Sequence, residues 1–336
     1  MGPLRRTATS ATVLATVAAI GLLAIPAAIA AFGARTQNEG NTVTAAPDFT
    51  PPAITATLVA KSLGGVTGFV HKGGTYFAYA NVSADTGNPA SGLATVKANL
   101  AELTGGQTEA ALTAGSYTVG AVTYGYRSAE LTANASVEGS TNYSVTAIDK
   151  AGNTRTVAGT ATVDNVAPTA TDIQTANGGT TVGKAEENDT VTYTFSEPMD
   201  PQSILAGWSG AATNVTVRIY DNGLLGLGGN DQLQIYDSTN TTLLPLGSVD
   251  LGRVDYAGGV LGGSYRFVNS TMTMSGNTIT IVFGTYSSTI LVDAGRTTAA
   301  GTGTMVWTPA ATPYDRAGNA MSASPATESG AADKEF

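Results

Sequence analysis

The five-residue pattern Asp-x-Ala-Gly-Asn occurs twice in the chain, at 149–153 and at 315–319. Each copy follows a strand-forming run, in a unit that begins with proline and a Thr-rich segment, PPAITATLV at 51–59 or APTATDI at 167–173. The aspartate side chain can accept hydrogen bonds from backbone N–H groups two residues on, and the glycine can take the positive φ that other residues resist. The repeat therefore predicts two copies of one plan, each containing a tight turn.

Short runs rich in Val, Thr, Tyr and Ile continue from residue 48 onward, separated by Gly, Asn, Asp and Pro. This spacing is typical of an all-β sandwich, and no amphipathic helix of useful length interrupts it. The clearest predicted strands are 75–83, 93–100, 122–131, 142–148, 191–195, 214–220 and 232–236, with a hairpin over 272–283. In the strand over 142–148, Tyr143, Val145 and Ala147 are expected to share one face.

The composition excludes several classes of catalytic and metal-binding site. Cysteine is absent, which excludes disulfides, thiolate metal sites and thiol nucleophiles. The one histidine, His71, leaves almost nothing from which to make a Ser-His-Asp triad, and beside a Gly-Gly turn we expect it to be an exposed loop residue. We therefore predict no catalytic residues and no enzyme.

The charge balance excludes nucleic acid as a partner. The net charge is −9, and residues 1–30 contribute +2 through Arg5 and Arg6, so the remainder carries −11. An acidic body of this kind repels phosphate backbones, and the chain has no cluster of Lys and Arg to overcome the repulsion.

The N-terminus has the organisation of an export signal. Arg5 and Arg6 precede an uncharged run from Thr7 to Phe32, and Ala28-Ile29-Ala30 fits the small-residue cleavage pattern. We predict cleavage after Ala30 and a secreted or cell-surface location. The alternative is an uncleaved membrane anchor, because about 20 apolar residues can span a bilayer.

These features divide the chain into five segments. They are a signal peptide at 1–30, an extended segment at 31–47, β-sandwich domains at 48–164 and 165–325, and a disordered tail at 326–336. The second domain is the longer, so extra strands or long loops between Ile204 and Ser270 are expected, and any special function would lie there.

Two segments resemble a known family. SVTAIDKAGNTRTVAGTATVDNVAPTAT, at 144–171, resembles the junction between tandem bacterial immunoglobulin-like domains of exported surface proteins. TFSEPMDPQSI, at 194–204, resembles an early strand and turn of a related type found in surface-layer and adhesin arrays. The resemblance covers about Pro51 to Asn319. It implies two tandem immunoglobulin-like β-sandwich domains, the second enlarged by insertions, in an exported protein.

The function expected from this combination is non-catalytic. We expect a structural spacer, adhesin or fibre component of the cell surface or extracellular matrix, with matrix components, polysaccharide or other copies of the chain as partners. The alternative is a carbohydrate-binding module that uses aromatic residues of the second domain, with Trp208 as the ligand residue. Trp307 is expected in the core of the sandwich, as a single large aromatic often is in this fold.

A calcium site is the one metal hypothesis. Asp149, Asp164 and Asn165 cluster in sequence around the junction, and calcium needs six to eight oxygen ligands. Further carboxylates of the second domain that could approach are Glu186, Glu187 and Asp189. The favoured alternative is a solvated acidic linker with an Asx turn and no cofactor, because no single segment of the sequence contains a full set of calcium ligands.

Two further segments carry hypotheses. Glu197 and Asp200 form an acid pair in SEPMD, but both flank prolines at a strand end, and sequence shows no cleft for catalysis. The segment AFGARTQNEGNTVTAA, at 31–46, weakly resembles the start of camelysin-type biofilm fibre proteins. Its Thr42-Val43-Thr44 run could add to the sheet edge of a neighbouring copy, and a flexible tether is the favoured alternative.

Overall fold

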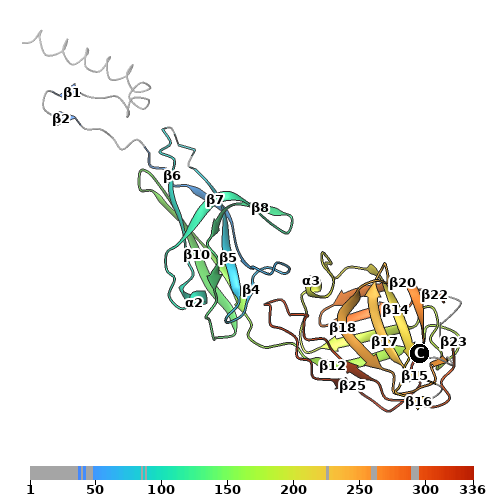
Figure 1. Cartoon of the computed structure of the whole chain (residues 1–336). Coiled ribbons are helices and arrows are strands. Elements are labelled where there is room, and N and C mark those ends of the chain that lie inside the picture. The colour runs from blue at the N-terminus through green and yellow to red at the C-terminus, as the bar shows by residue number, and fades with distance from the viewer. Residues whose placement is uncertain are drawn as a thin grey trace, which may run out of the picture.

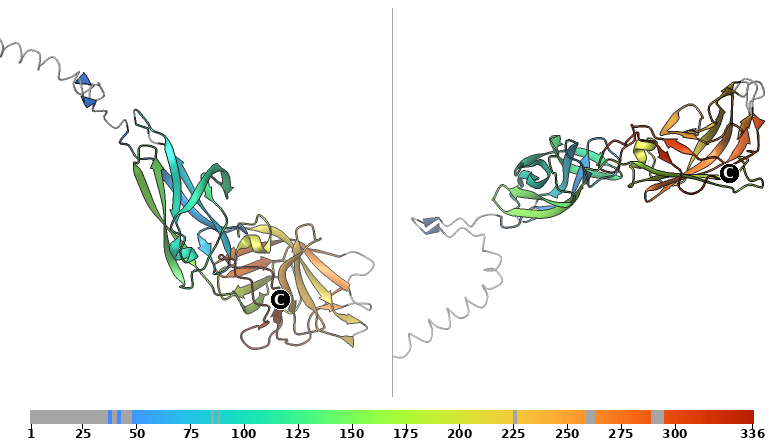
Figure 2. Two further views of the ribbon diagram at one scale, coloured as in Figure 1. Left: turned by 60° about the vertical axis from the view of Figure 1, so that its left-hand side comes forward. Right: turned by 90° about the horizontal axis from the view of Figure 1, so that it is seen from below.

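The computed structural model describes residues 37–38, 41–42, 48–84, 86–87, 89–224, 227–258, 263–288 and 295–336. They form two lobes that lie end to end, the first drawn in blue to green and the second in green to red (Figures 1 and 2). We call residues 48–164 the first lobe and residues 165–336 the second. The predicted export signal lies outside the described residues.

Strands dominate both lobes, so the all-β prediction is confirmed. The helices of the described part, α2 (Ala101–Thr104) and α3 (Pro201–Ile204), are about one turn each. Within the ranges that the structure describes, no helix has the length and apolar character needed to cross a membrane.

The first lobe is a sandwich or barrel-like arrangement of one continuous set of strands. Their order across the sheet is β3-β5-β8-β7-β6-β10-β11-β4, with β9 against β5. The strands are β3 (Ala53–Lys61), β4 (Phe69–Val70), β5 (Thr75–Ser83), β6 (Leu93–Asn99), β7 (Ala110–Val119), β8 (Val122–Ser128), β9 (Leu131–Thr132), β10 (Gly139–Asp149) and β11 (Thr154–Val163). Strand β7 starts against β6 and continues against β8, so it passes from one layer to the other.

Alternation along the strands places the core of the first lobe. Tyr143, Val145 and Ala147 are all buried on one face of β10, as the sequence predicts. They pack with Tyr76 of β5 and with Leu103 of α2, both fully buried. The short helix is therefore part of the core of the first lobe.

The second lobe is a longer set of strands, in the order β12-β13-β21-β20-β14-β17-β18-β24-β25, with β22 against β20. They are β12 (Ala170–Ala176), β13 (Thr190–Phe195), β14 (Thr213–Asp221), β15 (Gly223–Leu224), β16 (Leu227–Gly228), β17 (Gln232–Asp237), β18 (Leu243–Asp250), β19 (Ala257–Gly258), β20 (Gly263–Ser275), β21 (Thr278–Val282), β22 (Thr285–Ser287), β23 (Gly295–Arg296), β24 (Val306–Thr308) and β25 (Ala326–Thr327). Strands β15 to β19 lie where the sequence predicts additional structure.

Trp307 lies at the centre of the second core, where the sequence predicts it. Its ring is fully buried between the edges of Tyr193 and Phe195, at centroid distances of 5.0 and 5.1 Å. Its indole N–H donates to the carbonyl of Leu246 at 2.7 Å, so the buried polar atom is satisfied.

The C-terminal residues are packed, whereas the sequence led us to expect a disordered tail over 326–336. Strand β25 pairs with β24, and Phe336 is buried against Tyr256 and Phe283 at centroid distances of 5.6 and 5.3 Å. The physical reason is burial of this terminal aromatic ring, which the polar composition of the segment conceals.

The N-terminal segment is described in part. Strand β1 (Gln37–Asn38) pairs with β2 (Asn41–Thr42), and Thr42 lies opposite Gln37. Thr42 therefore pairs within its own chain in this structure, and the remainder of the segment proposed for strand donation lies outside the described residues.

Candidate functional site at the junction of the lobes

The two Asp-x-Ala-Gly-Asn turns have the same hydrogen-bond pattern. In the first, Asn153 donates from its backbone N to Asp149 Oδ1 at 2.8 Å and from Nδ2 to Asp149 Oδ2 at 2.9 Å. In the second, Asn319 donates in the same way to Asp315 at 2.9 and 2.8 Å. The glycine of each turn has positive φ, 91° in the first and 100° in the second. Each turn is thus held by an aspartate and an asparagine that hydrogen-bond to each other.

Each turn also holds the chain where it enters its own lobe. Asn153 Nδ2 donates to the carbonyl of Asp48 at 3.2 Å, and Asn319 Nδ2 donates to the carbonyl of Asp164 at 2.8 Å. One asparagine therefore ties a late turn to the entry segment. The two lobes repeat this arrangement, as the repeated motif in the sequence predicts.

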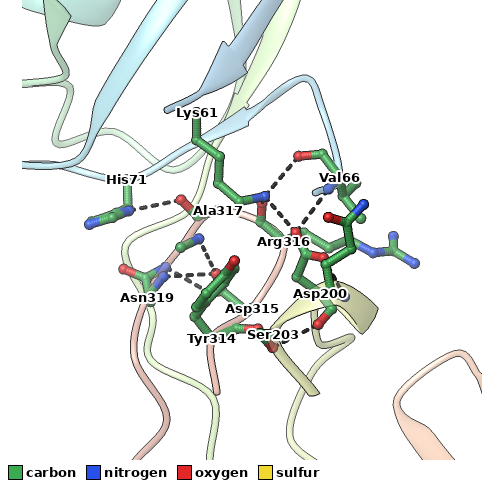
Figure 3. Close-up of polar contacts among 12 residues, drawn as sticks. Lys61, Val66, His71, Asp200, Ser203, Tyr314, Asp315, Arg316, Ala317 and Asn319 are labelled. Atoms are coloured by element: carbon green, nitrogen blue, oxygen red, sulfur yellow. Dashed lines mark hydrogen bonds and ion pairs between the residues drawn. The ribbon is translucent and has the colours of Figure 1, made fainter. Parts of the chain in front are cut away.

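The second turn differs from the first because the other lobe lies against it (Figure 3). His71 Nδ1 lies 2.8 Å from the carbonyl oxygen of Ala317, which can only accept, so Nδ1 carries the proton. Lys61 Nζ donates to the carbonyl of Arg316 at 2.8 Å. His71 was expected to be an exposed loop residue. Instead it is half-buried and holds the junction.

Lys61 and Asp200 form a buried ion pair between the lobes. Nζ of Lys61 lies 2.7 Å from Asp200 Oδ2, and the two side chains are 3% and 0% exposed. Lys61 Nζ donates a third hydrogen bond, to the carbonyl of Val66 at 2.8 Å. All three donors of the ammonium group therefore have acceptors, which a buried charge requires.

Asp200 accepts further hydrogen bonds from both lobes. Its Oδ1 accepts from Gln202 N at 3.0 Å, so Asp200 is the N-cap of α3, whose first residue is Pro201. Its Oδ2 also accepts from Val66 N at 2.8 Å. Glu197 and Asp200, which form an acid pair in the sequence, therefore have different partners. Asp200 binds Lys61, and Glu197 belongs to the carboxylate cluster described below.

Glycine allows the close approach at this contact. A Cβ built on Gly65 would collide with the carboxylate of Asp200, and Gly65 also has a φ of 77°. A Cβ on Gly318 would lie 3.2 Å from the His71 ring. A pocket of about 310 Å³ remains beside the ion pair, lined by both lobes, and Lys61 and His71 in its wall are each bonded to carbonyl oxygens.

Three carboxylates meet beside the second turn. Oxygen atoms of Asp164, Glu197 and Asp315 all lie within 4.8 Å of one another. Burial and, after it, the carboxylates of Asp164, Asp315 and Glu138 together raise the pKa of Glu197 to about 7. Hard oxygen ligands gathered in this way are of the type that a divalent cation binds.

The predicted calcium set Asp149, Asp164 and Asn165 is not brought together. Asp149 ends β10 and Asp164 follows β11, so they lie at opposite ends of a hairpin in which Gly139 pairs with Val163. Asn165 Oδ1 accepts from Lys72 N at 2.6 Å and therefore ties the linker to the first lobe. Of the three, Asp164 alone belongs to the junction cluster. Asp149 and Asp164 are therefore near each other in the sequence but far apart in the structure, because they lie at opposite ends of a long hairpin.

The acidic residues expected to approach from the second lobe lie at its far end. Asp189 immediately precedes β13, while Glu197 follows its other end. Asp189 Oδ1 accepts from the backbone N of Gly178 and Gly179 at 2.9 and 3.0 Å and so organises a loop. Its loop neighbours Glu186 and Glu187 are directed to Thr180 and to Tyr286 N.

Trp208 is a core residue, whereas the carbohydrate-binding alternative requires it at the surface as the ligand residue. It is 6% exposed, and its indole N–H donates to the carbonyl of Ala211 at 2.6 Å. The glycines on either side favoured an exposed loop, but the large apolar ring packs into the core of the second lobe. Trp208 is therefore not available to stack on a sugar.

Sequence reasoning missed the residues that join the lobes. Lys61 ends the apolar run ATLVAK of β3, and a lysine at the end of a buried strand was the available signal. The Gly64-Gly65 pair indicates a turn in the sequence but not a contact between the lobes. No local pattern pairs Lys61 with Asp200, because 139 residues separate them.

A scan against protein-family models found no matching family, and a search of the curated proteins found no matching relative.

Proposed function

We propose that this chain is an exported, non-catalytic protein of the cell surface or extracellular matrix, in which two immunoglobulin-like domains serve as a stiff structural spacer, adhesin or fibre component. The export part of the proposal rests on the cleavable signal expected at residues 1–30. The remainder rests on the strand order and on the junction.

The strand order of the first domain supports an immunoglobulin-like topology. With the two-residue strands β4 and β9 set aside, the layers read β3-β5-β8-β7 and β6-β10-β11. Counted along the chain, these are strands 1-2-5-4 and 3-6-7, which correspond to the ABED and CFG sheets of immunoglobulin sandwiches. The order β12-β13-β21-β20 in the second domain follows the first of these layers, with the hairpin β17–β18 added beyond β14.

The buried ion pair of Lys61 and Asp200 is the observation that carries the proposal. A freely hinged pair of domains would leave both side chains in water, whereas here both are desolvated and fully hydrogen-bonded. Breaking a buried pair by moving one partner away is strongly unfavourable, so the contact fixes the angle between the domains. A fixed angle is what a spacer needs in order to hold a binding surface away from the cell.

Small-angle X-ray scattering tests the spacer. The wild-type protein should give one narrow distribution of interdomain distances that matches the end-to-end arrangement, and Lys61→Met should broaden it. A broad distribution in the wild-type protein would contradict a stiff spacer. Export is tested separately, by probing medium, wall and membrane fractions of expressing cells for the protein and measuring the mass of its N-terminus.

A second candidate, carbohydrate binding, keeps one observation in its favour. Tyr220 and Tyr236 are half-buried on neighbouring strands, with their hydroxyl groups 2.8 Å apart, and the Arg218 guanidinium lies 4.2 Å from the centre of the Tyr236 ring. Rings and a guanidinium group side by side form a surface that can bind sugars through stacking and hydroxyl contacts. Pull-down on insoluble polysaccharides would support this function if retention were lost in Tyr236→Ala.

A cation at the junction fits the same role. We propose that Asp164, Glu197 and Asp315 bind calcium, which would cancel the repulsion among them and stiffen the junction. Two of the three belong to the chain segment and the turn that Asn319 ties together. Calcium would therefore add to a contact that already exists.

A further inference from the structure

A second cluster of carboxylates lies in the C-terminal segment of the second lobe. Oxygen atoms of Glu328, Asp333 and Glu335 all lie within 4.8 Å of one another. Glu335 and Glu328 are buried, at 1% and 9% exposed, and Asp333 is exposed. The cluster therefore has a buried floor and an opening to solvent.

The surrounding backbone holds this cluster in place. Glu328 Oε2 accepts from Met305 N at 2.8 Å, and Gly303 N donates to the carbonyl of Asp333 at 2.7 Å. Glu335 N donates to the hydroxyl of Tyr256 at 2.7 Å, and Glu335 Oε2 accepts from Thr175 Oγ1 at 2.5 Å. These hydrogen bonds connect the carboxylates to several separate segments of the lobe. The positions of the carboxylates are therefore fixed before any ligand binds.

One oxygen in this cluster has no partner. Glu335 Oε1 is buried, and no donor among the described residues reaches it. The ion pairs of the described chain also leave the three carboxylates without a lysine or arginine partner. Burying a carboxylate oxygen with neither a hydrogen bond nor a counter-charge is costly, so an acceptor in this position indicates a missing cation or proton.

The pKa of Glu335 is consistent with that need. Burial and, after it, the neighbouring carboxylates of Glu328 and Asp333 together raise the pKa of Glu335 to about 8, although the hydrogen bond from Thr175 lowers it.

We propose that Glu328, Asp333 and Glu335 form a calcium site that fastens the C-terminal segment to the second lobe. Calcium binds oxygens at about 2.3 to 2.6 Å, so two ligands on opposite sides of the ion lie about 4.6 to 5.2 Å apart. Magnesium binds at about 2.0 to 2.1 Å and draws opposite ligands to about 4.2 Å. Magnesium is also usually held by only one or two carboxylates, so three carboxylates with oxygen atoms within 4.8 Å of one another suit calcium better.

Each residue has a distinct part in the proposed site. Glu335 Oε1 supplies the buried ligand, Glu328 the second anchor, and Asp333 the exposed ligand through which the ion enters. Water completes the coordination on the exposed side. The ion would link the segment that follows β25 to Met305 and Thr175, which belong to other parts of the lobe.

Terbium luminescence on the whole purified protein tests this site. Terbium replaces calcium at oxygen sites, and excitation through Tyr256, which hydrogen-bonds to Glu335, should sensitise it. After chelator treatment, the wild-type protein should give saturable luminescence that calcium displaces. Glu335→Gln should weaken terbium binding by about tenfold or more, because ligand charge tunes affinity over orders of magnitude. Asp333→Asn should weaken it in the same direction.

The controls separate this site from the junction and from misfolding. Glu197→Gln removes a carboxylate from the junction cluster and should leave the Tyr256-sensitised signal unchanged. Glu335→Gln keeps an amide oxygen for Thr175, so its melting temperature in chelator should equal or exceed that of the wild type. The proposal is overturned if the wild-type protein gives no sensitised signal, or if magnesium displaces terbium as well as calcium does. It is also overturned if the signal survives Glu335→Gln and is lost in Glu197→Gln.

Discussion

Lys61 Nζ lies 2.7 Å from Asp200 Oδ2 across the junction, and neither side chain is more than 3% exposed. The same ammonium group bonds to Val66 of its own lobe and to Arg316 of the other. One lysine thus binds the loop that follows β3, the cap of α3 and the second Asp-x-Ala-Gly-Asn turn. One charged group therefore connects three segments of the junction, and substitutions can test its contribution directly.

Replacing Lys61 by methionine should uncouple the two lobes. The substitution keeps the length of the side chain but leaves Asp200 buried without its cation, a change that costs about 3 to 5 kcal/mol in comparable sites. Calorimetry should show one lobe melting earlier than in the wild type, with the two transitions further apart. Lys97→Met is the matched control, because Lys97 pairs with Glu109 at 3.1 Å on the surface and such pairs contribute about 1 kcal/mol or less. Equal losses in the two variants would refute a special role for Lys61.

Gly65→Ala should weaken the same contact without removing a charge. Gly64 and Gly65 both have positive φ, 79° and 77°, so alanine at either position carries a backbone strain of about 1 to 2 kcal/mol. Only at Gly65 would the new methyl group collide with the Asp200 carboxylate, since a Cβ on Gly64 meets nothing within 4 Å. The free energy of unfolding should fall further in Gly65→Ala than in Gly64→Ala. Denaturant titration measures the difference, and indistinguishable midpoints would count against the close approach.

Substitutions of Asn153 and Asn319 should affect different parts of the protein, although the two side chains make matching hydrogen bonds within their turns. Either alanine substitution removes the hydrogen bonds that the side-chain amide donates to a carbonyl and to a carboxylate oxygen, at a cost of about 1 to 3 kcal/mol. Asn319→Ala should also loosen the junction, because Asn319 holds the Asp164 carbonyl beside the second lobe. Asn153→Ala should affect the first lobe alone, where Asn153 holds the Asp48 carbonyl. Scattering curves that change equally in both variants would show that Asn319 has no junction role.

Features set by neighbours along the chain could be predicted from the sequence. Alternation placed Tyr143, Val145 and Ala147 on one buried face, and the repeated motif gave two turns of one geometry. These structures depend on backbone geometry within a few residues, so a local pattern is enough to reveal them.

Features set by packing between distant segments could not be predicted. Trp208 stands among glycines typical of an exposed loop, yet its ring is buried because the core of the second lobe accepts it. Asp149 and Asp164 are 15 positions apart by residue number, but the hairpin of β10 and β11 separates them in space. Glu197 joins Asp164 and Asp315 only once the second lobe has folded. A single sequence contains no local signal for such pairings.

Glu197 should make the stability of the junction dependent on pH. Its pKa in the folded protein is about 7, above the ordinary value of 4.5, because of burial and of the carboxylates of Asp164, Asp315 and Glu138. The folded state therefore holds more protons than the unfolded state between these two values, and stability falls as pH rises through that window. Glu197→Gln should flatten this slope between about pH 5 and 7. Melting temperatures across this range, in chelator, measure the effect, and an unchanged slope would remove Glu197 as its source.

Calcium should reverse this loss at the junction. Binding to Asp164, Glu197 and Asp315 replaces mutual repulsion with attraction to one ion, and an ion that binds only the folded form stabilises it according to its occupancy. At a calcium concentration about 100 times the dissociation constant, the gain is about 2.7 kcal/mol. Scans of the melting temperature against calcium at pH 7.5 should therefore show a rise in the wild-type protein. The rise that belongs to the junction is the part lost in Glu197→Gln and retained in Glu335→Gln, since Glu335 lies in the separate C-terminal cluster. A calcium response of the same size in the wild type and in Glu197→Gln would show that the junction carboxylates do not bind the ion.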